Sequence, residues 1–251
     1  MVKLNRANFK CISLIIYLFF FFLPKVNAQL SLKDSLTDVQ TKNNVVALFD
    51  SAFKGNVGLY NGGEYLYGGH NVKGFPYFKS NDILQGSVLY DGILYNDVPM
   101  RFDLTTNELV ILDYTKNFPI KLITSKLDYF VIDSSRFINA ANNYGIPLPQ
   151  TTDFYQVLYN NRSTVVARKE KQLILSSKLD ENDSHYIEFD WYYIYANDKL
   201  YTVDNEKSVL NAFEEKKTDL KKFIKANDIS FKKNFENAVV QTAAYYDQLK
   251  K

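Results

Sequence analysis

The chain has 251 residues, with 30 Lys and Arg against 28 Asp and Glu, and aromatic residues make up 16% of it. An apolar content of 46% with 23% charged residues is typical of a globular protein and excludes a disordered chain. A single cysteine excludes a disulfide scaffold and a zinc site built from thiolates.

Residues 1–28 have the organisation of a secretory signal peptide. A basic start is followed by an apolar run over Ile12–Leu23, and Val26-Asn27-Ala28 places small residues before a cut ahead of Gln29. The apolar run is shorter than the ~20 residues that a spanning helix needs, which favours cleavage over an uncleaved anchor. We therefore expect an exported protein, periplasmic or secreted.

Cleavage changes two properties of the chain. The mature part, residues 29–251, has no cysteine, because Cys11 lies in the leader. It also has 26 basic against 28 acidic residues, because four basic residues leave with the leader and no acid does. The positive charge of the whole sequence is therefore no argument for nucleic acid binding, and we expect none.

The first part of the mature chain contains few clear elements before a β-rich region. Residues 29–44 are expected to be a loose arm, and apolar spacing over 45–53 predicts a short helix. Asn61-Gly62 predicts a two-residue hairpin turn, since both residues tolerate positive φ. From Gly86 to Leu112 the sequence predicts a β-meander that turns at Asp91-Gly92.

Further short strands are expected after the meander, over 120–123, 127–132, 173–176 and 200–203. A hairpin is expected from 154–159 and 163–167, and the longest loop from Asn139 to Asp153. Tyr186 to Tyr195 is the strongest strand. Its alternation places Ile187, Phe189, Trp191, Tyr193 and Tyr195 on one face.

The period becomes helical near the C-terminus. A first helix begins at a cap, Ser208, and continues to Ile224, and a second carries an apolar stripe from Phe231 to Leu249. The predicted fold is α+β and mainly β: an antiparallel curved sheet or partial barrel with a C-terminal helical hairpin packed on it. Residues 29–251 form one mature domain, mostly β over 45–205 and helical over 206–251.

Several segments together resemble an uncharacterised family of signal-peptide-bearing proteins from Bacteroidota. They are Leu59-Tyr60-Asn61-Gly62, Gly74-Phe75-Pro76-Tyr77-Phe78, Gly86-Ser87-Val88-Leu89-Tyr90-Asp91-Gly92, Val98-Pro99-Met100-Arg101-Phe102-Asp103, Phe154-Tyr155-Gln156-Val157-Leu158-Tyr159, Tyr192-Tyr193-Ile194-Tyr195, Lys207-Ser208-Val209-Leu210 and Ala243-Ala244-Tyr245-Tyr246-Asp247. The resemblance covers nearly all of the mature chain. It implies an exported, single-module architecture and transfers no site residue.

Aromatic residues are the most unusual feature of the mature chain, which keeps 18 Tyr, 14 Phe and Trp191. Exposed rings on a sheet make stacking surfaces for sugars or apolar walls for lipids. Strand propensity and core packing explain such residues without a ligand. The candidate ligand contacts are Tyr60, Tyr65, Tyr67, Trp191 and Tyr193.

Paired acids indicate a possible hydrolase, because a glycosidase needs two carboxylates at a set separation. Glu188 and Asp190 lie on the same side of the Tyr186–Tyr195 strand, and His70 in a glycine-rich bend is a candidate base. A solvated strand face explains the two acids without catalysis, and a surface loop explains His70. No metal-binding spacing or phosphate-binding loop is found, so we expect no metal and no cofactor.

Three functions remain open. The first is a non-enzymatic exported protein that binds an apolar or glycan ligand or an envelope protein, or that acts in envelope assembly. The second is a carboxylate-dependent hydrolase of envelope or glycan substrates, and the third is a periplasmic carrier of lipids or lipoproteins. Residues 206–251 have ten Lys against seven acids. These lysines are either the water-facing side of docked helices or a peripheral contact with anionic lipid.

Overall fold

A computed structural model describes residues 57–67, 72–113, 115, 117–142, 144–151, 153–176 and 184–250. The predicted leader, the arm over 29–44, the helix over 45–53 and His70 lie outside these described residues. The described residues all belong to one unit, Phe53–Lys251.

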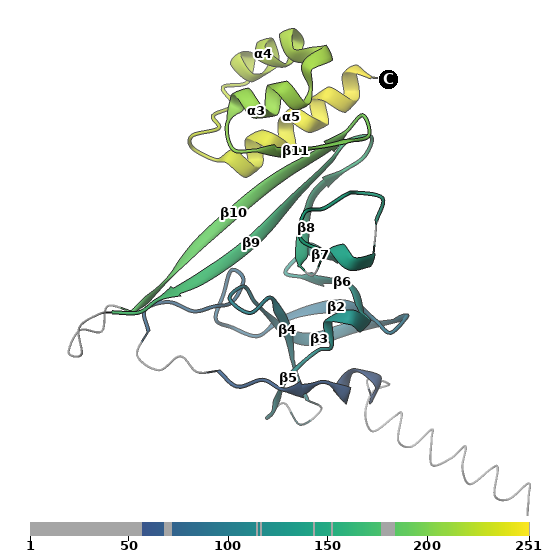
Figure 1. Cartoon of the computed structure of the whole chain (residues 1–251), viewed down its shortest axis with the longest axis vertical. Coiled ribbons are helices and arrows are strands. Elements are labelled where there is room, and N and C mark those ends of the chain that lie inside the picture. The colour runs from purple at the N-terminus through teal and green to yellow at the C-terminus, as the bar shows by residue number, and fades with distance from the viewer. Residues whose placement is uncertain are drawn as a thin grey trace, which may run out of the picture. The chain divides into compact units, whose positions relative to one another are not determined.

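The strands form one antiparallel sheet, which is open and curled rather than closed (Figure 1). In the described part of the chain it has 11 strands, in the order β1-β5-β4-β3-β2-β6-β7-β8-β9-β10-β11. They are β1 (Gly63–Glu64), β2 (Leu84–Tyr90), β3 (Ile93–Asp103), β4 (Glu108–Leu112), β5 (Pro119–Lys121), β6 (Leu127–Ile132), β7 (Ser135–Asn139), β8 (Phe154–Asn160), β9 (Thr164–Ile174), β10 (His185–Ala196) and β11 (Lys199–Val203). The predicted fold class is confirmed.

The described part of the chain also contains short 3-10 helices and three α-helices. The short 3-10 helices are η1 (Val57–Asn61), η2 (Thr124–Lys126), η3 (Ala140–Asn142) and η4 (Glu214–Lys216). The α-helices are α3 (Glu206–Ala212), α4 (Lys217–Ala226) and α5 (Phe235–Leu249), and they pack on the end of the sheet formed by β8 to β11.

Tight turns with positive φ set the order of the strands. Asp91-Gly92 joins β2 to β3 with φ of 52° and 76°, and Asn197-Asp198 joins β10 to β11 with φ of 49° and 58°. Both pairs have the type I′ conformation that suits the twist of an antiparallel hairpin. Asp133-Ser134 turns in the same way between β6 and β7, a strand that the sequence analysis missed.

The prediction of a hairpin turn at Asn61-Gly62 is wrong. Asn61 ends η1, and the side-chain oxygen of Asn61 accepts a hydrogen bond of 2.6 Å from the Tyr90 hydroxyl. Gly62 is needed for a close approach, because a Cβ there would lie 2.1 Å from the backbone oxygen of Lys121. The glycine therefore lets β1 pair with β5 rather than turn back on itself.

Rings of phenylalanine from β3, β6, β7 and β8 fill the core of the sheet away from the helices. Phe130 stacks on Phe137 with centroids 4.9 Å apart, and Phe102 meets both rings at 5.0 Å. Phe154 packs edge-on against Phe102 and Phe130. All four rings are buried, so a large share of the aromatic residues serves packing.

The first predicted helix is broken in two. Its N-cap is Asn205 rather than Ser208, and the two residues form a reciprocal capping box. The first of the two, α3, ends at Ala212, and the ring of its C-cap residue, Phe213, is buried against Tyr246 at 4.2 Å. The second, α4, begins after η4. In α5, the buried Asp247 carboxylate accepts hydrogen bonds from the Ser163 amide and the Tyr159 hydroxyl, which fastens the helix to the β8–β9 turn.

The β9–β10 hairpin is longer than the strands beside it. The predicted strand over 173–176 is the far end of β9, which continues because β10 pairs with it from Thr164 to Ile174. β8 pairs with β9 only as far as Ala167, and β11 pairs with β10 only from Tyr192. From Arg168 to Ile174 in β9, and from His185 to Trp191 in β10, the hairpin is therefore a two-stranded ribbon in the described part of the chain. Figure 1 shows it within the long pair of strands below the helices.

Gly62→Ala is expected to lower the free energy of unfolding by about 1–3 kcal/mol, because the added methyl group overlaps the Lys121 carbonyl. Gly63→Ala is the matched control, since the nearest atom to its Cβ is 3.7 Å away. Urea denaturation measures both. Equal losses for the two variants would contradict the close approach of β1 to β5.

Candidate functional site

A surface pocket of about 540 Å³ lies where β1, the β3–β4 turn, β5 and the β9–β10 ribbon meet. This volume is within the range of small-molecule sites. We call it the tyrosine pocket. Its lining residues are Glu64, Tyr65, Leu66, Tyr67, Pro76, Asp103, Thr105, Thr106, Glu108, Lys121, Leu173 and Tyr186.

Asp103 holds the inner wall of the tyrosine pocket in place. It ends β3 as a buried residue, and its carboxylate accepts hydrogen bonds from the amides of Thr105 and Thr106 at 2.7 and 3.1 Å. The Tyr65 hydroxyl donates a third bond, 2.5 Å long, to the same carboxylate. Burial and this hydrogen bond raise the pKa of Tyr65, so the phenol stays neutral and orients the ring.

Tyr67 and Tyr186 form the outer wall. Burial, together with the nearby Tyr67 side chain, raises the pKa of Tyr186 to about 12. The Tyr67 ring also packs against Tyr77 at 6.1 Å, and the Arg101 guanidinium lies over Tyr77 at 4.9 Å. Tyr67 itself is 42% exposed and presents its ring to the solvent side of the pocket.

The rim of the tyrosine pocket carries acidic groups. Glu64 is exposed, and Glu108 forms an ion pair of 2.8 Å with Lys121 from β5. With the buried Asp103, three carboxylates and one ammonium line the pocket. The site therefore offers hydrogen-bond acceptors around an aromatic and apolar floor.

Lys171 of β9 joins the ribbon to the segment that carries Tyr77. Its ammonium donates to the carbonyl oxygens of Tyr77 at 2.7 Å and Phe75 at 3.3 Å, and its amide donates to Leu104 at 3.0 Å. The ammonium also lies over the Phe75 ring at 4.5 Å. Burial lowers the pKa of this lysine, although Glu188 opposes the shift.

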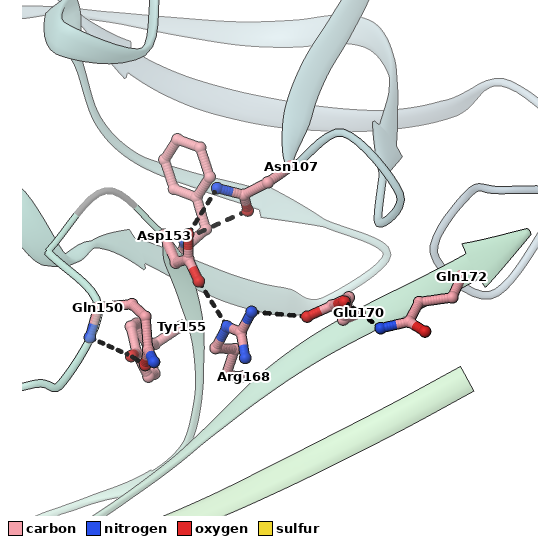
Figure 2. Close-up of polar contacts among 8 residues, drawn as sticks. Asn107, Gln150, Asp153, Tyr155, Arg168, Glu170 and Gln172 are labelled. Carbon is pink, nitrogen blue, oxygen red and sulfur yellow. Dashed lines mark hydrogen bonds and ion pairs between the residues drawn. The ribbon is translucent and has the colours of Figure 1, made fainter. Parts of the chain in front are cut away.

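A second polar network joins β9 to the loop before β8 (Figure 2). The Arg168 guanidinium pairs with Asp153 and, at 2.6 Å, with Glu170. Asn107 of the β3–β4 turn donates to Asp153 at 3.5 Å. The predicted long loop, Asn139 to Asp153, therefore ends at a residue that anchors β9.

Two of the five predicted ligand contacts, Tyr65 and Tyr67, come together in the tyrosine pocket. Tyr60 packs against the phenylalanine-rich core, and Tyr193 is buried against Tyr155 with centroids 5.8 Å apart. Trp191 is half-buried beneath the Arg168 guanidinium, 4.4 Å away. These three residues do not line the tyrosine pocket.

Glu188 and Asp190 share a face of β10, as predicted, but each lies beside a lysine. Glu188 is 3.8 Å from the Lys171 ammonium, and Asp190 is 3.0 Å from that of Lys169. Lys169 also pairs with Glu236 of α5 at 3.1 Å. Neither acid lines the tyrosine pocket, and the third candidate, His70, lies outside the described residues.

Sequence reasoning missed Tyr186, Glu108 and Lys121 as members of the site. Tyr186 precedes the aromatic face of its strand by one residue, and only the tertiary structure brings it into the same pocket as Tyr67. Glu108 and Lys121 are 13 residues apart on paired strands. Long-range strand pairing has no local signal in one sequence.

The surface of the helical end carries both signs of charge. Its exposed lysines are Lys207, Lys221, Lys222, Lys225, Lys232 and Lys233, and its exposed acids are Glu206, Glu214, Glu215, Asp219 and Asp228. Contact of these lysine side chains with anionic lipid stays a prediction. Across the described residues, no helix is long and apolar enough to cross a membrane, and no group of three or more His, Cys, Asp or Glu is arranged to hold a metal ion.

Comparisons with protein-family models, with curated proteins and with solved structures found no match to this chain. The resemblance to an exported Bacteroidota family therefore stays a prediction. The class that the fold defines is an open, curled antiparallel sheet with helices packed on one end and the tyrosine pocket at its surface.

Tyr65→Phe tests the inner wall through the pH dependence of stability. An unfolded tyrosine ionises near pH 10, whereas the raised pKa keeps folded Tyr65 protonated. Above pH 10 the unfolded chain loses this proton first, so the free energy of unfolding falls as pH rises. We expect Tyr65→Phe to make that fall shallower, by up to about 1.4 kcal/mol per pH unit, in urea denaturation between pH 10 and 11.5. An unchanged slope would contradict the assignment.

Proposed function

We propose that this chain is an exported, non-enzymatic binding protein whose tyrosine pocket takes a carbohydrate ligand. The observation that carries the proposal is the convergence of Tyr65, Tyr67 and Tyr186 with a carboxylate rim in one pocket of about 540 Å³. Tyrosine rings offer flat apolar faces to the C–H groups of a sugar ring. The rim carboxylates accept hydrogen bonds from sugar hydroxyls.

A glycan fits this pocket better than a purely apolar ligand. An apolar ligand would cover Glu64 and Glu108 without replacing the hydrogen bonds that these carboxylates make to water, which costs free energy. A sugar replaces those bonds. The lipid-carrier alternative has less support, because the phenylalanine rings inside the sheet pack against one another at 4.9 to 5.8 Å.

The hydrolase alternative also has less support. Its two candidate carboxylates, Glu188 and Asp190, lie beside lysine ammonium groups and away from the tyrosine pocket. Within the pocket, Asp103 accepts three hydrogen bonds and Glu108 is paired with Lys121. These contacts suit carboxylates that orient other groups. They leave no unpaired buried acid as a proton donor of the kind that glycosidases use.

Export is part of the proposal, and it rests on the leader over residues 1–28. Expressed with its leader in a bacterial host, the chain is expected in the periplasmic or secreted fraction with Gln29 at its N-terminus. Intact-mass measurement and N-terminal sequencing check this. Full-length protein that begins at Met1 in the cytoplasmic fraction would contradict export.

Carbohydrate binding is testable by calorimetry against a panel of tetrasaccharides of glucose, N-acetylglucosamine, xylose and mannose. We expect at least one to bind, and Tyr67→Ala to weaken that binding by about tenfold, since an aromatic contact contributes ~0.5–1.5 kcal/mol beyond its area.

Tyr144→Ala is the matched control, because Tyr144 is 41% exposed, close to the 42% of Tyr67, and lies outside the pocket. No binding of any tetrasaccharide would overturn the carbohydrate proposal. Equal weakening by Tyr67→Ala and Tyr144→Ala would place the binding elsewhere.

A further inference from the structure

The outer edge of β10 has a gap in its pairing. On one side of the gap, Lys73 forms a parallel bridge with His185, and its amide donates to the Ser184 carbonyl at 2.8 Å. On the other side, β11 begins to pair at Tyr192. Across the described residues, no strand pairs with this edge of β10 between Ile187 and Trp191.

The direction of the backbone groups in this gap follows from one hydrogen bond. In an antiparallel ladder, opposed residues either exchange both of their backbone bonds or neither. The Lys171 amide donates to Leu104, away from β10, so Lys171 and its partner Glu188 are a pair that exchanges neither. The N–H and C=O of Glu188 therefore point outward, and by alternation those of Asp190 do too.

The exposed side chains beside this edge alternate in character. On one face, Ile187 is 39% exposed and Phe189 is 37% exposed, and the Phe189 ring stacks with Trp191 at 6.0 Å. On the other face are Glu188 and Asp190. An edge with free backbone groups and an apolar row beside it is the arrangement that binds an extended peptide as an added strand.

The accessible charge at this edge is acidic, even though lysines lie close to it. The side chains of Lys169 and Lys171 are only 8% and 10% exposed. Those of Glu188 and Asp190 are 48% and 28% exposed, and Glu236 of α5 adds a third carboxylate at 36%. A partner strand therefore meets carboxylates, because the lysine side chains that balance their charge are more deeply buried than the carboxylates.

This charge disfavours a second copy of the chain as the occupant. Two β10 strands paired about a two-fold axis at Phe189 place Glu188 of one copy directly opposite Asp190 of the other. Like charges directly opposite destabilise a strand pair. A strand with basic residues at those positions and apolar residues between them suits both faces.

We propose that the edge of β10 from Ile187 to Trp191 binds an extended peptide segment that alternates apolar and basic residues. The segment extends the sheet by one strand, in line with β11. Its backbone bonds to Glu188 and Asp190, its apolar side chains cover Ile187 and Phe189, and its basic side chains meet the carboxylates. This site is separate from the tyrosine pocket and does not depend on the carbohydrate proposal.

Hydrogen exchange measured by NMR tests the free edge. In the protein alone, we expect the amides of Glu188 and Asp190 to exchange quickly, while those of Ile187 and Phe189, bonded to β9, are protected. Adding an acetylated and amidated nine-residue peptide of alternating valine and lysine is expected to protect Glu188 and Asp190 at least tenfold. Protection of these two amides in the protein alone would show an edge already paired and would overturn the proposal.

Two control peptides separate strand addition from charge attraction. The first carries N-methyl groups on alternate residues, which removes its backbone donors, and the second replaces lysine with glutamate. By fluorescence polarisation we expect both to bind at least tenfold more weakly than the valine-lysine peptide. An N-methylated peptide that binds equally well would overturn strand addition, and so would a valine-lysine peptide that does not bind.

Glu188→Pro and Glu188→Ala form a matched pair of variants. Both remove the carboxylate, but only proline also removes the outward N–H, a change that an edge strand tolerates. We expect Glu188→Pro to bind the peptide at least fivefold more weakly than Glu188→Ala. Unfolding by urea and the protection of the Phe189 amide show that both variants are folded, and equal affinities of the two would overturn the role of the backbone.

Discussion

The buried ammonium of Lys171 joins the β9–β10 ribbon to the segment that carries Phe75 and Tyr77, which does not pair with β9 as a strand. The β9–β10 hairpin extends past β8 and β11, so its far half has little sheet to support it. Lys171 ties that half to the carbonyls of Phe75 and Tyr77 and, through its amide, to Leu104. A charge taken out of water is stable only when it is fully hydrogen-bonded or paired, and here two carbonyls, an aromatic face and Glu188 serve that purpose.

The tyrosine pocket is a consequence of that attachment. The segment that Lys171 holds places Tyr77 beneath Tyr65 and Tyr67, while the ribbon itself contributes Leu173 and Tyr186. The Asp103 carboxylate fixes the orientation of Tyr65 by accepting a hydrogen bond from its hydroxyl. The same overhang that creates the pocket also leaves the outer edge of β10 without a partner strand from Ile187 to Trp191 in the described part of the chain, so the two proposed binding sites share one structural cause.

Much of the sheet was predictable because its signals are local. Asp91-Gly92 turns the chain where the tolerance of both residues for positive φ predicts a turn, and the alternation from Tyr186 to Tyr195 gives the correct faces of β10. The prediction was wrong where a distant contact overrides a local preference. Asn61-Gly62 has the residues of a hairpin turn, yet Gly62 serves the approach of β5, and a helix expected to be continuous breaks at Phe213, which is buried against Tyr246.

The sequence by itself determined the class of fold, the helical end and the abundance of aromatic residues, because periodicity and turn chemistry act over a few residues. It also marked Tyr65 and Tyr67 as candidate contacts. Only the tertiary structure decided that Tyr186, Glu108 and Lys121 join them, that Tyr193 is buried, and that Glu188 and Asp190 lie beside lysines. These outcomes depend on which strands pair and where each pairing stops, and the lengths of neighbouring strands are set by contacts between residues far apart in the chain.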